Sequence, residues 1–211
     1  MHWTGRIAEG ARSTAGIWSV PAALCAIMVA LWGGGAHVFD ALVLRADAVA
    51  SGQWWRLVTG HFVHWSAWHV AVNAGGLAIW LLLCPVRWSL PRWGGVLVVE
   101  ALAVSGGVLW MSPDVMRYAG FSGILHGLFL VALVPQAFAG DRIAGACLLY
   151  LVGKVGLEQI VGPVMSDAEH IGAAIATESH LAGLLGGLAL LLAPRGWRAV
   201  APRVSRRSRG D

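Results

Sequence analysis

The hydrophobic residues of this chain fall into six long runs that short polar segments separate. The runs predict helices at 17–36, 68–85, 94–111, 122–139, 143–164 and 171–193. Each run approaches the roughly 20 residues that a helix needs to cross the hydrocarbon core of a bilayer. The pattern therefore predicts an all-α membrane protein, built as a compact bundle of six transmembrane helices.

One long connection interrupts this pattern between the first and second predicted helices. Residues 36–66 are semi-apolar and contain Trp54, Trp55 and Arg56, which are typical anchors at a membrane surface. We expect this connection to lie in the interface as a long loop and not as a separate domain. His61, which also lies in it, is expected to be solvated.

The composition agrees with a membrane protein. Of the 211 residues, 57% are hydrophobic and only 12% are charged, whereas an ordinary soluble domain is about 25% charged. The twelve tryptophans suit interfacial belts. The three cysteines lie in or beside apolar runs without metal-ligand spacing, so we interpret them as small buried hydrophobic residues.

The arginines predict the orientation of the bundle. If both termini are cytoplasmic, eleven arginines lie inside, and Arg45, Arg56 and Arg117 lie outside, as the positive-inside rule favours. The inside arginines are Arg6, Arg12, Arg87, Arg92, Arg142, Arg195, Arg198, Arg203, Arg206, Arg207 and Arg209.

This orientation predicts three parts of the chain. Residues 1–16 form a cytoplasmic N-terminus, 17–193 the six-span membrane domain, and 194–211 a basic cytoplasmic tail. We expect the tail to lie near anionic lipid and not to bind nucleic acid.

Ser122 is the first candidate for chemistry. It opens a predicted helix between Gly120 and Gly123. A serine in this position is often only an N-cap. However, glycines allow a tight turn and close approach of other groups, and free N–H groups at a helix start suit a developing oxyanion.

His180 is the candidate base. A histidine inside a membrane helix is costly and needs a partner. Small residues on the two helices would let them pack closely enough for His180 to take the proton of Ser122. These small residues are Gly123 and Gly127 on one helix, and Gly183, Gly186 and Gly187 on the other. Glu178 lies about 200° away from His180 around the helix, so no carboxylate is evident and a Ser–His dyad is predicted.

His69 and Asn73 share one helix face because they are four residues apart. Both can donate hydrogen bonds, and with the Ser122 amide they could hold an oxyanion, while His64 braces the site. The competing interpretation is a metal or haem site. Its ligands would be His61, His64, His69, His126 and His180, which lack an HExxH pattern and an accompanying carboxylate.

The motifs together resemble the rhomboid family of intramembrane serine proteases. In order they are Trp55-Arg56, His64-x4-His69-x3-Asn73, Gly120-x-Ser122-Gly123 and His180-x2-Gly183-x3-Gly187. The resemblance implies that Ser122 is the nucleophile and His180 its partner, and that His69, Asn73 and the Ser122 amide form the oxyanion hole. It also implies cleavage of transmembrane protein substrates in the lipid bilayer, without metal or cofactor, in a bacterial inner membrane.

The chain departs from the family pattern at two places. His126 stands where many rhomboids have a tyrosine that stacks on the catalytic histidine, and Leu83-Cys84 stands where many have a glutamate. The run Gly-x-Ser-Gly-x-Leu-His-Gly from Gly120 and the short chain resemble the rhombosortase subgroup. That resemblance implies processing of C-terminal tails made of glycines, one hydrophobic span and a basic end.

Two other functions stay open. One is a catalytically inactive rhomboid-like protein that binds transmembrane clients, although such proteins usually lack the serine or the histidine. The other is a small transporter or metal-binding protein that uses the histidines. Lys154 and Glu158 are four residues apart, and we interpret them as a paired charge facing the bundle interior, with substrate gating as an alternative.

Overall fold

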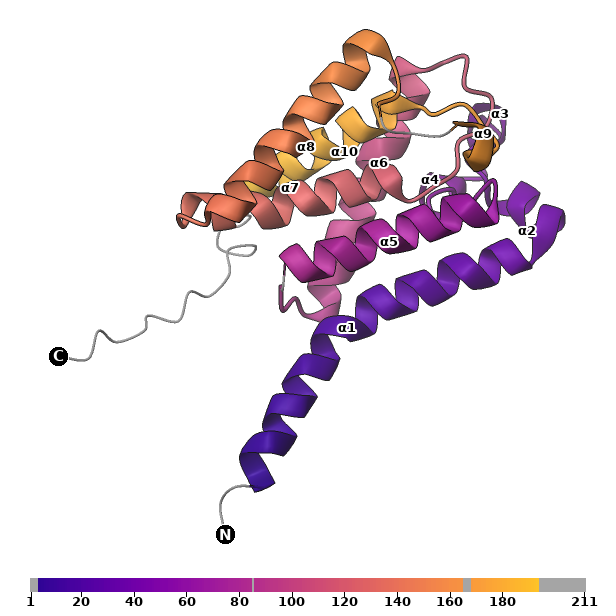
Figure 1. Cartoon of the computed structure of the whole chain (residues 1–211). Helices are drawn as coiled ribbons and strands as arrows, with labels where there is room; N and C mark the ends of the chain where they lie inside the picture. Colours follow the sequence, from indigo (N-terminus) through magenta and orange to yellow (C-terminus); the bar gives the residue numbers. More distant parts are fainter. Residues whose placement is uncertain (1–3, 85, 165–167, 194–211) are drawn as a thin grey trace.

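The computed structural model describes residues 4–84, 86–164 and 168–193, and these residues form helices and connecting loops without a β-strand (Figure 1). The helices are α1 (Thr4–Gly33), α2 (Gly35–Leu42), α3 (Ala46–Ala50), α4 (Arg56–Thr59), α5 (Ala67–Leu83), α6 (Leu90–Met111), α7 (Ser122–Phe138), α8 (Arg142–Val161), α9 (Ala168–Ile171) and α10 (Thr177–Leu192). The predicted basic tail at 194–211 lies outside the described residues.

Each of the six predicted apolar runs overlaps one of the longer helices, although α1 begins at Thr4, well before the predicted start at 17. α6 and α8 are long and apolar enough to cross a membrane, and the pair α1–α2, bent by 115°, makes a third if it is one span. The apolar helices α5, α7 and α10 have 17, 17 and 16 residues and are shorter. The helices are those of an all-α membrane protein, with two or three spans by length and composition.

Two predicted elements differ from the structure. The run 171–193 is not one helix, because α9 ends at Ile171 and α10 begins only at Thr177. The connection 36–66 is not a plain loop either, since it contains most of α2 and the short helices α3 and α4. Gly172, with φ +83°, follows α9 and gives the chain the left-handed turn that separates it from α10.

α7 is the central helix, and it packs against α5, α6, α8 and α10. Residues all round it are buried, including Leu125, Leu128 and Val131, which is typical of a helix enclosed by others. The outer helices instead carry large exposed apolar side chains, as expected for surfaces that face lipid. On α8 these are Ile143, Leu149, Tyr150, Val152, Leu157, Ile160 and Val161.

Glycines bring the backbones of α7 and α10 into direct contact. A Cβ added at Gly183 would overlap the carbonyl of Gly123, and one added at Gly187 would lie 2.9 Å from the carbonyl oxygen of Gly127. A methyl group at either position would hold the helices apart. The close contact that the spacing of these glycines predicts is therefore present.

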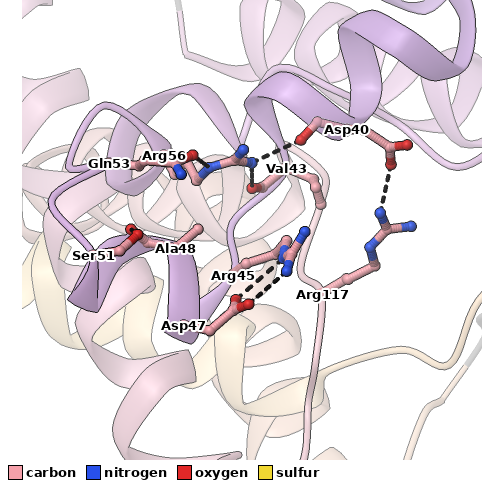
Figure 2. A network of polar contacts seen from close by, with 9 residues as sticks. All are labelled: Asp40, Val43, Arg45, Asp47, Ala48, Ser51, Gln53, Arg56 and Arg117. Atoms are coloured by element: carbon pink, nitrogen blue, oxygen red, sulfur yellow. Dashed lines mark hydrogen bonds and ion pairs between the residues drawn. The ribbon is translucent and has the colours of Figure 1, made fainter.

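Polar contacts hold the connection between α2 and α5 (Figure 2). The Arg56 guanidinium is buried, and it donates to the carbonyl oxygens of Asp40 and Val43 and to Gln53 Oε1. Arg117 pairs with the Asp40 carboxylate and thereby ties the connection before α7 to α2. The Arg56 side chain thus braces the fold, which differs from its predicted role as a surface anchor.

His61 is also buried, contrary to the prediction that it is solvated. Its Nε2 lies 3.0 Å from the Ala101 carbonyl oxygen and 2.9 Å from Ser105 Oγ, both on α6. This histidine therefore fastens the connection that precedes α5 to the side of α6.

Replacing Gly183 with alanine is expected to destabilise the fold by about 1–3 kcal/mol, because the new methyl group overlaps backbone that cannot rotate away. Thermal unfolding of the purified protein measures the effect. Gly153→Ala on α8 is the control, since apart from its chain neighbours and the backbone of its own helix no described atom lies within 4 Å of a Cβ at that position. Equal melting temperatures for Gly183→Ala and wild type would contradict the backbone contact of α7 and α10.

Candidate active site

Ser122 is the first residue of α7, and the backbone turns sharply just before it. Gly120 has φ +124°, a conformation that residues with side chains rarely adopt, and a Cβ there would lie 2.6 Å from His69 Cε1. Glycine is therefore needed at 120 both for the turn and for the approach of the His69 ring. The first N–H groups of α7, which include that of Ser122, lack partners within the helix.

His180 meets Ser122 across the contact of α7 and α10. The distance from His180 Nε2 to Ser122 Oγ is 3.2 Å, and both residues line a cavity of about 240 Å³. His180 lies in the first turn of α10, because this helix begins at Thr177 and not at the predicted residue 171. The contact pairs a hydroxyl with an imidazole nitrogen, the arrangement that activates a serine nucleophile.

Glu158 completes a group that the sequence analysis missed. Its Oε2 lies 2.8 Å from His180 Nδ1, and its side chain is fully buried between α8 and α10. The expectation that no carboxylate lies beside His180 is therefore wrong, because Glu158 contacts its ring. The catalytic role of Ser122 and His180 stays a prediction. The four-residue spacing of Lys154 and Glu158 indicates that both lie on one face of α8. The sequence does not indicate that this face of α8 contacts His180.

His126 lies one turn after Ser122 and stacks on His180. The ring centroids are 4.1 Å apart with an interplanar angle of 17°, and His126 Nδ1 lies 2.7 Å from the Ser122 carbonyl oxygen. An imidazole thus occupies the place against the candidate base where the resemblance leads one to expect a tyrosine.

His69 and Asn73 line the same cavity from α5. Ser66 caps this helix by accepting a hydrogen bond from the His69 backbone N–H. Asn73 Nδ2 donates to the His69 carbonyl oxygen, which uses one of its two hydrogens. The His64 ring packs edge-on against His69, with centroids 4.8 Å apart. The side chains of His69 and Asn73 therefore face the space in front of Ser122, and His64 supports His69 from behind.

The metal interpretation is tested by the donors that come together. His126, Glu158 and His180 offer ligand atoms within 4.8 Å of one another. However, the Lys154 ammonium lies 2.6 Å from Glu158 Oε1 and 3.4 Å from His126 Nε2. A cation therefore already contacts two of the three ligands, and His61, His64 and His69 are not part of this group. The arrangement fits the metal interpretation poorly.

Two histidines outside the membrane helices are held in the neutral form. Burial lowers the pKa of His61 to about 4. Burial, together with the nearby His69, lowers the pKa of His64 to about 3. The His64 ring that packs against His69 is therefore uncharged at neutral pH.

The apolar helices are those of an integral membrane protein, and the serine–histidine pair lines a cavity that polar and apolar side chains share. Residues 51–195, more than half of the chain, match the family model of the Rhomboid domain, and the chain therefore belongs to the rhomboid family. The predicted family is confirmed, whereas the rhombosortase subgroup stays a prediction.

Two Bacillus subtilis (strain 168) proteins are similar to this chain. One, named "Putative rhomboid protease YdcA", is 25% identical over 144 residues, which are 67% of this chain and 68% of that protein. The other, "Rhomboid protease GluP", is 26% identical over 143 residues, which are 66% of this chain but only 26% of GluP. The names support intramembrane protease activity at the level of the family.

Acid is expected to destabilise the fold through His64. An unfolded histidine has a pKa of about 6.5, so between that pH and the folded pKa of about 3 the unfolded chain binds more protons. Stability is therefore lost as the pH falls below about 6.5, by about 2 kcal/mol at pH 5 for this residue.

Melting temperatures at pH 7 and pH 5 test this expectation, and His64→Gln should lose less stability than wild type on acidification. The exposed His37 provides the control substitution His37→Gln, which should behave as wild type. An acid-induced loss of the same size in His64→Gln and wild type would contradict the assignment.

Proposed function

We propose that this chain is a serine endopeptidase that cleaves membrane proteins in or near a transmembrane segment. The observation that carries the proposal is the 3.2 Å contact of Ser122 Oγ with His180 Nε2 in a cavity among apolar helices. Serine is a weak nucleophile until a base takes its proton, and this contact supplies the base.

In the proposed reaction Ser122 Oγ attacks the scissile carbonyl carbon while its proton passes to His180 Nε2. The tetrahedral intermediate then collapses, and His180 returns the proton to the leaving amine. A water molecule, deprotonated by His180, then attacks the acyl carbon. The bond to Ser122 Oγ breaks, the acyl group leaves as a carboxylic acid, and His180 returns the proton to Ser122 Oγ. Every proton is transferred through one imidazole nitrogen, so the chemistry requires no metal or cofactor.

The proposed oxyanion hole consists of the Ser122 backbone N–H and the side chains of His69 and Asn73. All three residues line the cavity, and Gly120 allows the His69 ring to lie against the turn before Ser122. Such donors are typically worth about 10²–10³ each in rate, because they bind the oxygen more strongly as its charge develops. Gly123 and Gly183 contribute by letting α7 and α10 approach.

We further propose that residues 17–193 cross the bilayer six times, with the interfacial connection 36–66 and with both termini in the cytoplasm. A helix in each of six apolar runs and the arginine asymmetry support this arrangement. The residues 1–16 and 194–211 are then cytoplasmic, and the active site lies toward the outer face of a bacterial inner membrane.

The proposed substrates carry a C-terminal anchor of glycines, one hydrophobic span and a basic end. The run from Gly120 to Gly127 supports this choice by its resemblance to rhombosortases. A helix must unwind before its carbonyl groups reach Ser122, and glycine lowers the cost of unwinding. Small residues at the cut are therefore expected to be preferred.

A fluorophosphonate probe tests the proposed nucleophile without knowledge of the substrate. In native membranes wild type should be labelled, while Ser122→Ala and His180→Ala at equal folded levels should not, because one lacks the hydroxyl and the other the base. Gel fluorescence measures the labelling. Equal labelling of Ser122→Ala would exclude Ser122, and an unlabelled wild type would favour a catalytically inactive binder of transmembrane clients.

A reporter protein tests the proposed substrate class. A soluble domain fused to a tail of glycines, a hydrophobic span and arginines should be released by wild type and retained with Ser122→Ala. Replacing two of the glycines with leucine should slow release about tenfold, since each glycine favours unwinding by about 0.8 kcal/mol. Two leucines placed at the basic end provide the control. Unchanged release after the glycine replacements would contradict the requirement for unwinding.

A further inference from the structure

Five polar residues, four of which line the cavity, form a closed ring of contacts that begins at the Ser122 carbonyl oxygen and ends at the Ser122 hydroxyl. His126 Nδ1 lies 2.7 Å from the Ser122 carbonyl oxygen, and His126 Nε2 lies 3.4 Å from Lys154 Nζ. Lys154 Nζ donates to Glu158 Oε1 at 2.6 Å. Glu158 Oε2 lies 2.8 Å from His180 Nδ1, and His180 Nε2 lies 3.2 Å from Ser122 Oγ. The ring of contacts joins α7, α8 and α10 beneath the nucleophile.

The chemistry of the fixed groups determines where the protons lie in this ring of contacts. A carbonyl and a carboxylate only accept, and an ammonium only donates. His126 therefore carries its proton on Nδ1, toward the Ser122 carbonyl, and offers Nε2 to Lys154. His180 likewise carries its proton on Nδ1, toward Glu158, which leaves the lone pair of Nε2 toward Ser122 Oγ. The tautomer that a general base needs is the one that Glu158 imposes.

Lys154 and Glu158 balance each other's charge before the reaction, and Glu158 stabilises the charge that forms on His180 during it. Glu158 is fully buried, and an isolated carboxylate there would be costly, so Lys154 is needed to keep it ionised. When His180 takes the proton of Ser122, the new imidazolium lies against the Glu158 carboxylate. A carboxylate in this position both orients the ring and stabilises its charge.

An ion pair that served packing alone would not need the second contact of Glu158. Lys154 and Glu158 are one turn apart on α8, so their mutual bond forms within a single helix. The other carboxylate oxygen instead reaches α10 and meets the ring nitrogen of His180 that faces away from Ser122. His126, stacked on His180 at 4.1 Å, closes the remaining side of the ring.

We propose that Glu158 is a positioning residue that orients the His180 ring toward Ser122. Lys154 holds the Glu158 carboxylate in place, and His126 holds the His180 ring by stacking on it. The inference rests on the proposed function, since it concerns how the base of that site is oriented. It replaces the interpretation of Lys154 and Glu158 as a packing pair or a substrate gate.

The rate of phosphonylation by a fluorophosphonate probe in native membranes tests the proposal. Glu158→Gln keeps the shape but lacks the charge, and its amide can present a donor to His180 Nδ1. We expect the saturating rate to fall on the order of 10²–10⁴-fold, with the probe concentration at half-saturation unchanged within about twofold. Glu158→Asp should recover part of the rate. Glu178→Gln, the same substitution two residues before His180, is the matched control and should react as wild type.

A second set of variants covers a failure of Glu158→Gln to fold. The double variant Lys154→Met/Glu158→Gln buries a neutral pair, and its saturating rate should also lie on the order of 10²–10⁴-fold below that of wild type. Where Glu158→Gln folds, the two variants should react equally slowly. Lys154→Met should therefore lower the rate of phosphonylation only in protein that retains Glu158, because Lys154 acts through the Glu158 carboxylate. Additive effects of the two substitutions would contradict the proposed action of Lys154 through Glu158.

The outcomes separate this inference from the proposed function. A rate in Glu158→Gln or in the double variant equal to wild type, with no reaction in Ser122→Ala, would overturn only the role of Glu158. A loss of probe affinity without a loss of saturating rate would also overturn it, in favour of a gate. Reaction of Ser122→Ala at the wild-type rate would instead overturn the proposed function itself.

Discussion

The contact between the backbones of α7 and α10 is the constraint on which the rest of the site depends. Gly123 and Gly183 meet without side chains between them, so the two helices approach more closely than any larger residue would allow. Ser122 lies next to one of these glycines, and His180 lies one turn before the other. The pairing of hydroxyl and imidazole at 3.2 Å is therefore a direct result of the helix packing.

The second constraint comes from placing polar groups inside an apolar bundle. A buried polar group without a partner costs more than a solvated one, so the groups beneath Ser122 must satisfy one another. Lys154, the single lysine of the chain, neutralises Glu158, and Glu158 in turn binds His180. The same contacts that make these residues tolerable inside the bundle also set the orientation of His180.

The sequence predicts most of the helices because hydrophobic length and glycine spacing are local signals. The ends of α5, α6 and α7 lie within four residues of the predicted ones, and the contact of Ser122 with His180 follows from small residues on two helices. The contact of Glu158 with His180 was not predicted, because it joins residues 22 apart through the relative rotation of α8 and α10. The periodicity of a fully apolar helix carries little information about that rotation.

The other differences have the same physical origin. The burial of His61 depends on Ala101 and Ser105 of α6, about 40 residues away, and no local pattern indicates such a partner. The turn at Gly172 separates α9 from α10. Gly172 lies within an apolar run, so the hydrophobic pattern does not indicate this turn. Sequence patterns thus predict which segments are helical, whereas the partners of isolated polar residues require the packed structure.

The central claim is that helix packing activates Ser122 and no other serine of the cavity. Peptide mapping by mass spectrometry after treatment with a fluorophosphonate tests it most directly, because Ser179 lines the same cavity one residue before His180. The account predicts a single adduct on the peptide that contains Ser122. An adduct on Ser179, or cleavage of a membrane reporter by protein that carries no adduct after saturating treatment, would contradict it.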